Sequence, residues 1–550
     1  MRRGKSTFAA CLLTALFSAC FFSGCLFSGD GKHAADPSAE YYSTSTEGLP
    51  AADTTSTVNM RDGDTLRLKV EFVKQRIAGR WVRMMGYNRS VPGPTIKAPQ
   101  GSQIHLVLSN LTDIPVTMHS HGVRLDYAMD GTAGFSQKAI LQGDSFTYAI
   151  RFPDPGIFWY HSHFREDYSQ EMGLYGNFLV TPSDSGYYHP VDREAVLMLD
   201  DIQIDGTGPE TFRKKEVDHT LMGRFGNTLL INGDTGYTLT IKRNEVVRFY
   251  ATNSANARTF QIGFDRNMLK VIGGDNGLYE TPVFSALELI AVGERSIFEA
   301  YFNDTGMVDI IHSFPGQTMV IGHIHVLPDS AVTGYYRTWF NPADSSLAAI
   351  RSIDPFRPFF DKEPDKELIL TGTMGGGAMM NMAMKTAAVA ARAASAAKAT
   401  PTAKVTASAH IPGDVNNMGV EWYDHMPEAN SASTTETVRW IMRDKRTGEE
   451  NHNIFWSFKT GDKVMIRIYN DSLAMHPMAH PIHFHGQRFL VLNVNGSRVP
   501  DLAWKDTFLI GKGYTVDILL DASNPGGWMA HCHISEHMED MMMLYYHVGD

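Results

Sequence analysis

The chain has 550 residues, of which 43% are hydrophobic and 20% are charged. These fractions are close to those of ordinary globular proteins and exclude wholesale disorder, collagen-like repeats and a polytopic membrane protein. The formal net charge of -11 at pH 7 removes the electrostatic attraction to a phosphate backbone, so nucleic acid is not expected as a partner. Two counts are unusual, namely 28 methionines, and 22 histidines beside only four cysteines.

Residues 1–25 have the layout of an export signal. A basic stretch at residues 2–5 precedes a mainly apolar run over residues 8–27, and this order is typical of a secretory signal. The small residues before Cys25 resemble a bacterial lipobox, with Cys20 as a second candidate; an ordinary cleaved signal or a retained anchor is the alternative. We therefore expect an exported protein, periplasmic or at the cell surface, that contacts the membrane through a lipid anchor at Cys25.

Residues 26–57 follow as a predicted flexible tether, because they are rich in Ser, Thr, Ala and Asp. If Cys25 carries the lipid, the folded body contains one thiol, Cys532, and no disulfide is possible there. A lone cysteine in an exported protein needs another use.

An internal repeat predicts the architecture. The segments 101–110, 244–253 and 461–470 align without gaps, and each has apolar residues at its fourth, sixth and eighth positions. This period of two is typical of a strand with one face packed inward. With many short strands bounded by Gly and Pro, it predicts an all-β protein of three antiparallel β-sandwich domains. We expect these domains at residues 58–183, 184–330 and 366–550, with a linker at 331–365.

Histidine pairs occur in matching positions of the first and third domains. A single His-x-His pair is a weak signal and is compatible with zinc, whereas four such pairs in two repeats are a strong one. The second domain has no pair at these positions and only a weak one near its end, His323 and His325, which is typical of a structural role. We interpret this domain as a spacer that holds the outer domains apart. The pairs are His119 and His121, His161 and His163, His483 and His485, and His531 and His533.

Strand geometry separates these residues into two sites. Residues two apart on a strand point the same way, so each pair directs both imidazoles to one face, where the first and third domains meet. Four pairs suit a cluster of several metals. Cys532 lies between His531 and His533 and must face the opposite side, which predicts a second site.

Three further residues can reach the sulfur of Cys532. His480 precedes His483 by three residues, and His537 and Met542 follow Cys532 by five and ten. Two imidazoles, a thiolate and a weak thioether describe a blue-copper site, whereas a structural zinc site takes four strong ligands. The first domain has Val116 and Ser162 at the positions of His480 and Cys532, so only the third can hold this copper.

The four histidine motifs resemble those of the multicopper oxidases, over roughly residues 58–550. The resemblance implies three cupredoxin-like Greek-key domains and four copper ions, namely one type 1, one type 2 and a type 3 pair. The implied ligands are His480, Cys532, His537 and Met542 for type 1, His119 and His483 for type 2, and His121, His161, His163, His485, His531 and His533 for type 3.

The resemblance also implies an activity. Four one-electron oxidations at the type 1 copper would be coupled to the reduction of dioxygen to water, with Cys532 carrying electrons to the cluster. Asp130 matches an acidic residue of the family, and we expect it to donate protons. Met538 stands where many bacterial laccases have Glu, so Glu539 is a possible substitute. The family's usual Gly before the axial ligand is Met541 here, and Met542 is assigned by spacing alone.

The third domain contains a Met- and Ala-rich insertion at residues 374–430. Thioethers are soft ligands that prefer Cu(I), so we expect a copper-gathering lid, Cu(I) as the reductant and a role in copper tolerance. The alternative reductant is a small phenol, as in laccases. An alternative function is that of a copper-sequestering lipoprotein. The alternative role for the methionines is packing alone. The candidate substrate-copper residues are Met374, Met379, Met380, Met382, Met384, Met418, Met426 and Met478, with Met475 and His476 nearby.

Overall fold

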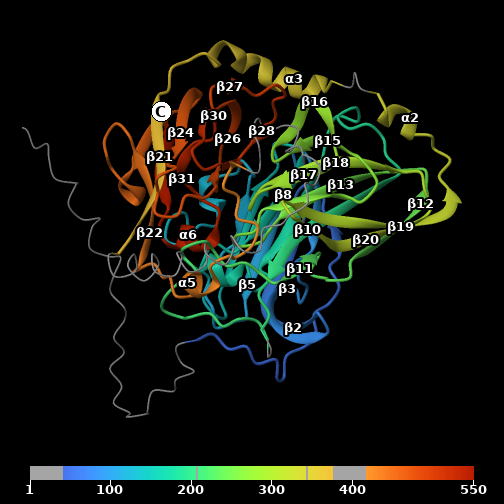
Figure 1. The fold of residues 1–550 in the computed structure, drawn as a ribbon, viewed down its shortest axis with the longest axis horizontal. Coiled ribbons are helices and arrows are strands. Elements are labelled where there is room, and N and C mark those ends of the chain that lie inside the picture. The colour runs from blue at the N-terminus through green and yellow to red at the C-terminus, as the bar shows by residue number, and fades with distance from the viewer. Residues whose placement is uncertain (1–40, 206–207, 342–344, 376–416) are drawn as a thin grey trace, which may run out of the picture. The chain divides into compact units, whose positions relative to one another are not determined.

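The computed structural model describes residues 41–205, 208–341, 345–375 and 417–550 (Figure 1). The predicted signal, Cys25, and Met379, Met380, Met382 and Met384 lie outside these ranges. In the described part of the chain, no helix is both long enough and apolar enough to cross a membrane. Strands dominate the described ranges, where they form six sheets.

The first two sheets have the strand orders β1-β4-β9-β8-β6 and β3-β2-β5-β7. One hydrophobic core contains residues of both sheets, so they form a sandwich. Their elements are β1 (Thr57–Asn59), β2 (Thr65–Ile77), β3 (Arg80–Tyr87), β4 (Thr95–Pro99), β5 (Gln103–Asn110), β6 (His119–His121), η2 (Tyr127–Met129), β7 (Ser145–Arg151), β8 (Gly156–His161), α1 (Glu166–Ser169) and β9 (Tyr175–Thr181).

The middle sandwich has the strand orders β11-β10-β13-β18-β15-β16 and β12-β20-β19-β14-β17 around its own core. Its strands are β10 (Arg193–Ile202), β11 (Thr228–Ile231), β12 (Thr238–Arg243), β13 (Glu245–Asn253), β14 (Phe260–Phe264), β15 (Leu269–Gly274), β16 (Gly277–Ser285), β17 (Leu287–Ile290), β18 (Arg295–Phe302), β19 (Gly306–Phe314) and β20 (Gln317–Ser330).

The last sandwich has the orders β22-β21-β24-β30-β26-β27, with β28 beside β26, and β23-β32-β31-β25-β29. Its core is continuous across both sheets. The elements are β21 (Lys366–Met374), α5 (Pro427–Ser431), β22 (Val438–Asp444), η5 (Asn451–Asn453), β23 (Phe455–Lys459), β24 (Asp462–Asn470), β25 (His480–Phe484), β26 (Arg488–Val494), β27 (Ser497–Arg498), β28 (Trp504–Lys505), β29 (Thr507–Ile510), β30 (Thr515–Ala522), β31 (Gly526–Cys532), α6 (Ser535–Glu539) and β32 (Met543–Gly549).

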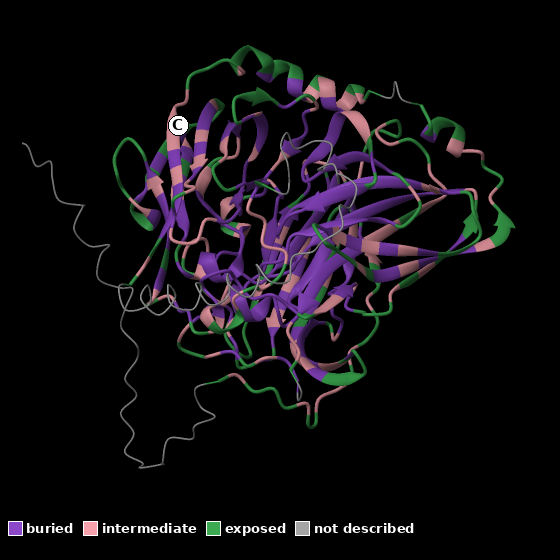
Figure 2. Cartoon of the chain, in the orientation of Figure 1, coloured by how far each residue is buried: buried purple, intermediate pink, exposed green. Residues whose placement is uncertain are grey.

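The three repeat segments occupy equivalent places in the three sandwiches. They form β5, β13 and β24, and each pairs in parallel with one strand and antiparallel with another. Their alternating apolar residues are buried, as the period of two predicts. Figure 2 shows that buried residues are concentrated along the strands in the interior of the folded part. The domain limits given above stay a prediction.

One connecting segment, the predicted tether, differs from its prediction in part. Residues 41–57 pack on the folded body: the ring of Tyr42 stacks on Tyr168 at 4.0 Å, and Ala52 N donates to Lys74 O at 2.8 Å. The predicted tether therefore does not extend over these residues, because aromatic packing and strand-like hydrogen bonds outweigh a polar composition. The predicted linker contains α2 (Tyr336–Trp339), α3 (Leu347–Ile353) and η3 (Asp354–Phe359).

Candidate metal centre

Two strand pairs with the same geometry bring the histidine motifs together. In the first sandwich β6 pairs with β8 and His119 lies directly opposite His161. In the last sandwich β25 pairs with β31 and His483 lies opposite His531. The second histidine of each pair follows two residues later, so each sandwich presents four imidazoles on one face.

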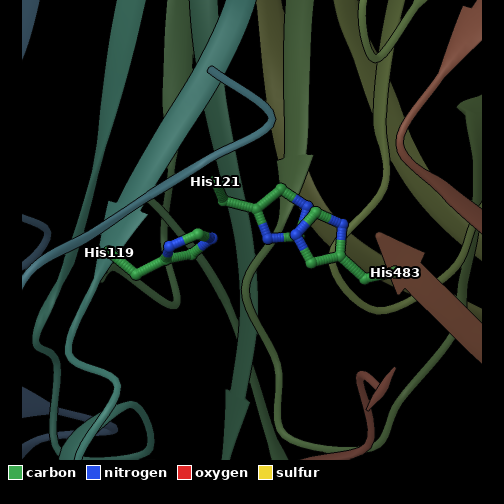
Figure 3. Close-up of side chains that lie close together, drawn as sticks. All are labelled: His119, His121 and His483. Carbon is green, nitrogen blue, oxygen red and sulfur yellow. The ribbon is translucent and has the colours of Figure 1, made fainter. Parts of the chain in front are cut away.

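The eight imidazoles of the four pairs form one buried cluster between the first and last sandwiches. Figure 3 shows three of them, with the rings of His121 and His483 stacked at 3.7 Å between centroids. The side-chain nitrogens fall into sets whose atoms lie within 4.8 Å of one another, a spacing that could hold metal ions. These sets are His119, His121 and His483; His121, His161 and His533; and His163, His485 and His531.

A second buried cluster lies within the last sandwich. The sulfur of Cys532 is 3.6 Å from His480 Nδ1 and 3.8 Å from His537 Nδ1. Met542 is fully buried in the core cluster that contains Cys532, whereas Met541 is 40% exposed and Met543 belongs to another cluster. Of the three consecutive methionines, Met542 is therefore the one packed with the cysteine.

The ionisation of these residues suits metal binding. Burial lowers the pKa of His480 to about 3 and the pKa of His163 to about 4, so both imidazoles are neutral at pH 7. Burial raises the pKa of the Cys532 thiol, so a thiolate there requires a cation.

Several buried nitrogens lack a partner in the described chain. A buried polar atom without a hydrogen bond is costly, and a bound metal ion would satisfy these nitrogens. An all-imidazole cluster beside an imidazole–thiolate site is a donor set that fits copper. In the larger cluster, the unpartnered atoms include Nε2 of His119, His161, His163 and His483.

Two models of the family described as multicopper oxidase match residues 56–185 and 416–550. The chain belongs to the multicopper oxidase family. Like other multicopper oxidases, it is an oxidoreductase that uses copper, dioxygen and a reductant.

Curated relatives match along most of their length. The multicopper oxidase MmcO of Mycobacterium tuberculosis is 26% identical, over 84% of this chain and 82% of its own. A copper resistance protein A homolog of Pseudomonas syringae pv. tomato is 22% identical, over 87% of this chain and 91% of its own.

Solved structures show the same fold. The multicopper oxidase of Campylobacter jejuni, described as a metallo-oxidase, has a TM-score of 0.64 at 19% identity and covers 92% of this chain and 99% of its own. This likeness confirms the predicted fold class of three cupredoxin-like sandwiches.

Asp130, the predicted proton donor, contacts the larger cluster of this multicopper oxidase. Its Oδ2 lies 3.0 Å from His485 Nδ1, and its backbone oxygen lies 2.7 Å from His119 Nδ1. The hydroxyl of Thr132 donates to the same Oδ2. The carboxylate is therefore fixed between two imidazoles and is almost fully buried.

Glu539, the predicted substitute on the opposite side, contacts the cluster only indirectly. Its Oε1 accepts a hydrogen bond at 2.8 Å from the backbone N of Glu166. The side chain of Glu166 is fully buried, and its Oε1 lies 2.8 Å from His161 Nδ1. Glu166 was not predicted from the sequence, although it follows His163 by three residues, because no strand or helix period links the two.

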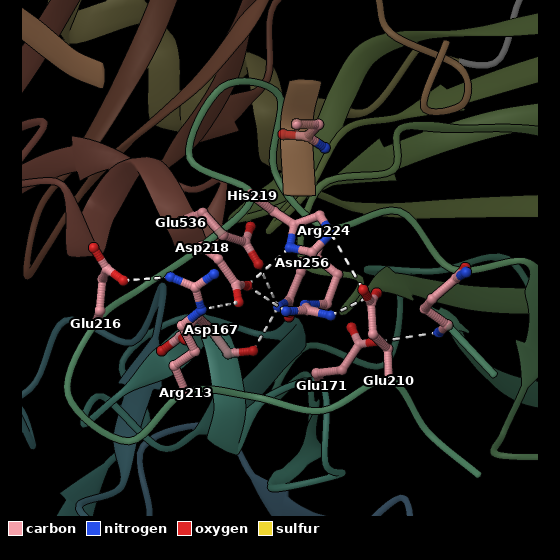
Figure 4. Close-up of polar contacts among 12 residues, drawn as sticks. Asp167, Glu171, Glu210, Arg213, Glu216, Asp218, His219, Arg224, Asn256 and Glu536 are labelled. Carbon is pink, nitrogen blue, oxygen red and sulfur yellow. Dashed lines mark hydrogen bonds and ion pairs between the residues drawn. The ribbon is translucent and has the colours of Figure 1, made fainter. Parts of the chain in front are cut away.

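A buried polar network joins the α6 segment to the other two sandwiches (Figure 4). Asn256 Nδ2 donates to Glu536 Oε1 at 3.1 Å and to Asp167 O at 2.7 Å. Arg224 pairs with Asp218 at 2.5 Å. Burial raises the pKa of Glu536 to about 7. The network fixes the segment that carries His537 relative to the segment that follows His163.

The histidines of the second cluster are covered. The ring of Trp440 lies 4.7 Å from His480 and 4.5 Å from His537 between centroids, and its Nε1 donates to Thr220 O at 2.7 Å. His480 is 1% exposed and His537 is 0% exposed. Within the described ranges, neither imidazole edge is open to solvent.

The described candidate methionines lie on two different cores. Met478 is buried in the core that contains Cys532, and Met374, Met426 and Met475 pack against that core. Met418 is fully buried in a separate cluster with Leu289 and Leu509, which is a packing role.

The side chain of Glu421 contacts two histidines, His425 and His476. Its carboxylate oxygens lie 3.1 Å from His425 Nδ1 and 3.3 Å from His476 Nε2. Although burial opposes it, hydrogen bonds to the two imidazoles lower the pKa of Glu421 to about 2. Glu421 is therefore anionic at neutral pH. His476 was noticed in the sequence but Glu421 was not, because Glu421 lies 55 residues earlier in the chain.

Proposed function

We propose that this multicopper oxidase oxidises Cu(I) to Cu(II) with dioxygen and serves copper tolerance. The proposal assigns His480, Cys532, His537 and Met542 to a type 1 copper. It assigns His119 and His483 to a type 2 copper, and His121, His161, His163, His485, His531 and His533 to a type 3 pair.

Four copper ions bound in this way would store the four electrons that reduction of dioxygen to two waters requires. The chain supplies the connection, because Cys532 is joined by the backbone to His531 and His533. Asp130 would pass protons to the cluster, and its carboxylate lies 3.0 Å from His485. Although burial opposes it, the neighbouring His485 and His119 hold the pKa of Asp130 well below its usual range, so the carboxylate must first take up each proton that it passes on. Burial of both clusters excludes bulk water from them.

The feature that favours Cu(I) is the covering of His480 together with the metal-binding side chains near it. Its imidazole is covered, so a bulky organic donor has no direct access, whereas a metal ion can bind at the surface nearby. Glu421, His425 and His476 offer one carboxylate and two imidazoles there, and Met475 packs against the same core. Imidazole and thioether donors suit copper.

A phenolic reductant is the second candidate, and one cavity favours it. The cavity has a volume of about 530 Å³ and is lined by aromatic residues that include Phe225, Phe314 and Tyr423, together with Arg258 and Glu428. This size suits a small organic molecule. A sequestering protein without turnover is the third candidate. For each of them we propose export, with attachment to a membrane at Cys25.

Oxygen consumption with Cu(I) and with dimethoxyphenol separates the candidates. We expect Glu421→Gln and His476→Gln to lower kcat/KM for Cu(I) about 10-fold or more and to leave phenol oxidation unchanged. Glu436→Gln, an exposed change of the same charge shortly before β22, is the matched control. Equal loss with both substrates would contradict a Cu(I) site, and no oxygen uptake with either would favour sequestration.

A deletion of residues 376–416 tests the predicted lid. These bounds are chosen because Met374 ends β21 and Asn430 is buried in the core, so a longer deletion would remove packed residues. We expect the Cu(I) activity to fall while the phenol activity persists or rises. Unchanged Cu(I) kinetics would remove the insertion from the function.

A further inference from the structure

One side chain of the middle sandwich reaches the larger metal cluster. Arg295 begins β18 and is fully buried. Its Nη1 donates to Asp506 Oδ1 at 2.7 Å, and its Nη2 donates to Asp506 Oδ2 at 2.5 Å. Two parallel charge-assisted hydrogen bonds fix the plane as well as the position of a carboxylate. The middle sandwich is therefore more than the spacer that the sequence indicated.

Asp506 passes this constraint to the imidazoles. Its Oδ1 lies 3.0 Å from His121 Nε2 and accepts a hydrogen bond from Thr507 Oγ1 at 2.9 Å. Its backbone oxygen accepts from His483 Nδ1 at 3.0 Å. Arg295 and the cluster are thus joined through one carboxylate.

His121 is oriented differently from its neighbours. A neutral imidazole has one donor and one acceptor nitrogen. Because Nε2 of His121 faces the carboxylate, Nε2 carries the proton and Nδ1 carries the lone pair. That Nδ1 faces His533, with its Nε2 at 3.2 Å. His119, His161, His163 and His483 instead leave Nε2 without a partner in the described chain.

Gly122 makes room for this arrangement. It follows His121 directly and has a φ of +81°, a conformation that other residues adopt at a cost. A side chain there would collide with Arg295 Nη2 and Asp506 Oδ2. The glycine that follows the first histidine pair is thereby explained by the ion pair between Arg295 and Asp506.

We propose that Arg295 is a positioning residue for the copper cluster. It holds Asp506 in the plane that keeps the proton of His121 on Nε2 and presents Nδ1 to the metal. The proposal rests on the proposed copper sites, and it concerns how tightly they hold copper rather than which reductant they serve.

The test is the copper content and spectra of Arg295→Gln. Loss of a residue that orients a ligand typically weakens metal binding about 10–100-fold. We expect loss of copper from the cluster, with weaker type 2 electron paramagnetic resonance and type 3 near-ultraviolet absorption, while the blue type 1 absorption stays. Unchanged copper affinity and spectra would overturn the proposal.

Arg248→Gln is the matched control. Arg248 forms a buried ion pair with Glu299 at 2.6 Å between two strands of the same sheet, β13 and β18. Its loss destabilises the sandwich in a similar way but should leave the cluster spectra intact. If both variants lost cluster copper equally, the role of Arg295 would be only structural and the proposal would fail.

Two further variants keep the test decisive. Arg295→Lys keeps the charge but not the paired hydrogen bonds, so we expect it to lose less copper than Arg295→Gln. If Arg295→Gln does not fold, the copper content of Arg295→Lys is compared with that of Arg248→Lys, and only Arg295→Lys should lose cluster copper. Because Arg295 acts through Asp506, Arg295→Gln with Asp506→Asn should lose no more copper affinity than the worse single variant. Additive losses would overturn the proposal. A wild-type protein without type 2 and type 3 signals would instead refute the proposed function.

Discussion

The first and last sandwiches carry the same pair of histidine-bearing strands but differ at two positions. Val116 bridges to Ile140 in the first, whereas His480 pairs with Ile510 in the last. Ser162 stands at the place of Cys532, and its hydroxyl has no hydrogen-bond partner in the described chain. Each of these two sandwiches thus contributes four imidazoles to the larger cluster, but only the last one forms the site around Cys532. The two side chains that differ, at the positions of His480 and Cys532, account for this.

The largest effect is expected at Cys532. Cys532→Ser removes both the thiolate ligand and the covalent link between the clusters, so we expect no detectable turnover, no blue absorption and about one copper ion fewer per molecule. Absorption spectra and copper analysis measure this. The reverse change, Ser162→Cys, should create no blue site because Val116 offers no nitrogen; a new blue band would contradict the comparison.

The second-largest effect is expected at Asp130, an acidic residue of the first sandwich that contacts the larger cluster. Asp130→Asn keeps the shape of the side chain but removes the acid, and loss of a positioned acid typically lowers turnover about 10²- to 10⁴-fold. The turnover number at saturating reductant measures this, with blue absorption retained. Asp126→Asn, at the cap of η2, is the control. A loss confined to copper content would make Asp130 a structural residue instead.

Removal of copper should loosen the contact between these two sandwiches. A ligand present at about 1,000 times its dissociation constant stabilises the folded state by about 4 kcal/mol, and the larger cluster lies between the two. We expect a lower Tm for the copper-free protein in calorimetry, restored by adding copper. Since Cys532→Ser keeps the larger cluster, its Tm should fall less; an equal fall would contradict a bridging role.

The smallest effect is expected at Met541, beside the site that only the last sandwich has. Met541 has a φ of +68°, which costs a residue other than glycine about 1 kcal/mol. Met541→Gly should therefore raise the free energy of unfolding by about 1 kcal/mol, measured by denaturant titration. Met268→Gly is the control, because Met268 is similarly exposed at 46% but lacks a positive φ; it should destabilise.

The sequence predicted those features that depend on local period and spacing. Alternating residues in β5, β13 and β24 give the sandwiches, and the parity of His531, Cys532 and His533 separates the two clusters. Arg295, Asp506 and Glu166 could not be predicted in the same way, because they reach the histidines only through tertiary packing. The stacking of Tyr42 on Tyr168 was likewise invisible to a composition argument.

The larger cluster takes its imidazoles from both ends of the polypeptide, from His119 to His533. The first four of these imidazoles lie on one sandwich and the last four on another, which is synthesised later. The cluster can therefore form only after both sandwiches have folded and come together. Its formation reports the tertiary assembly of the protein rather than the folding of any one domain.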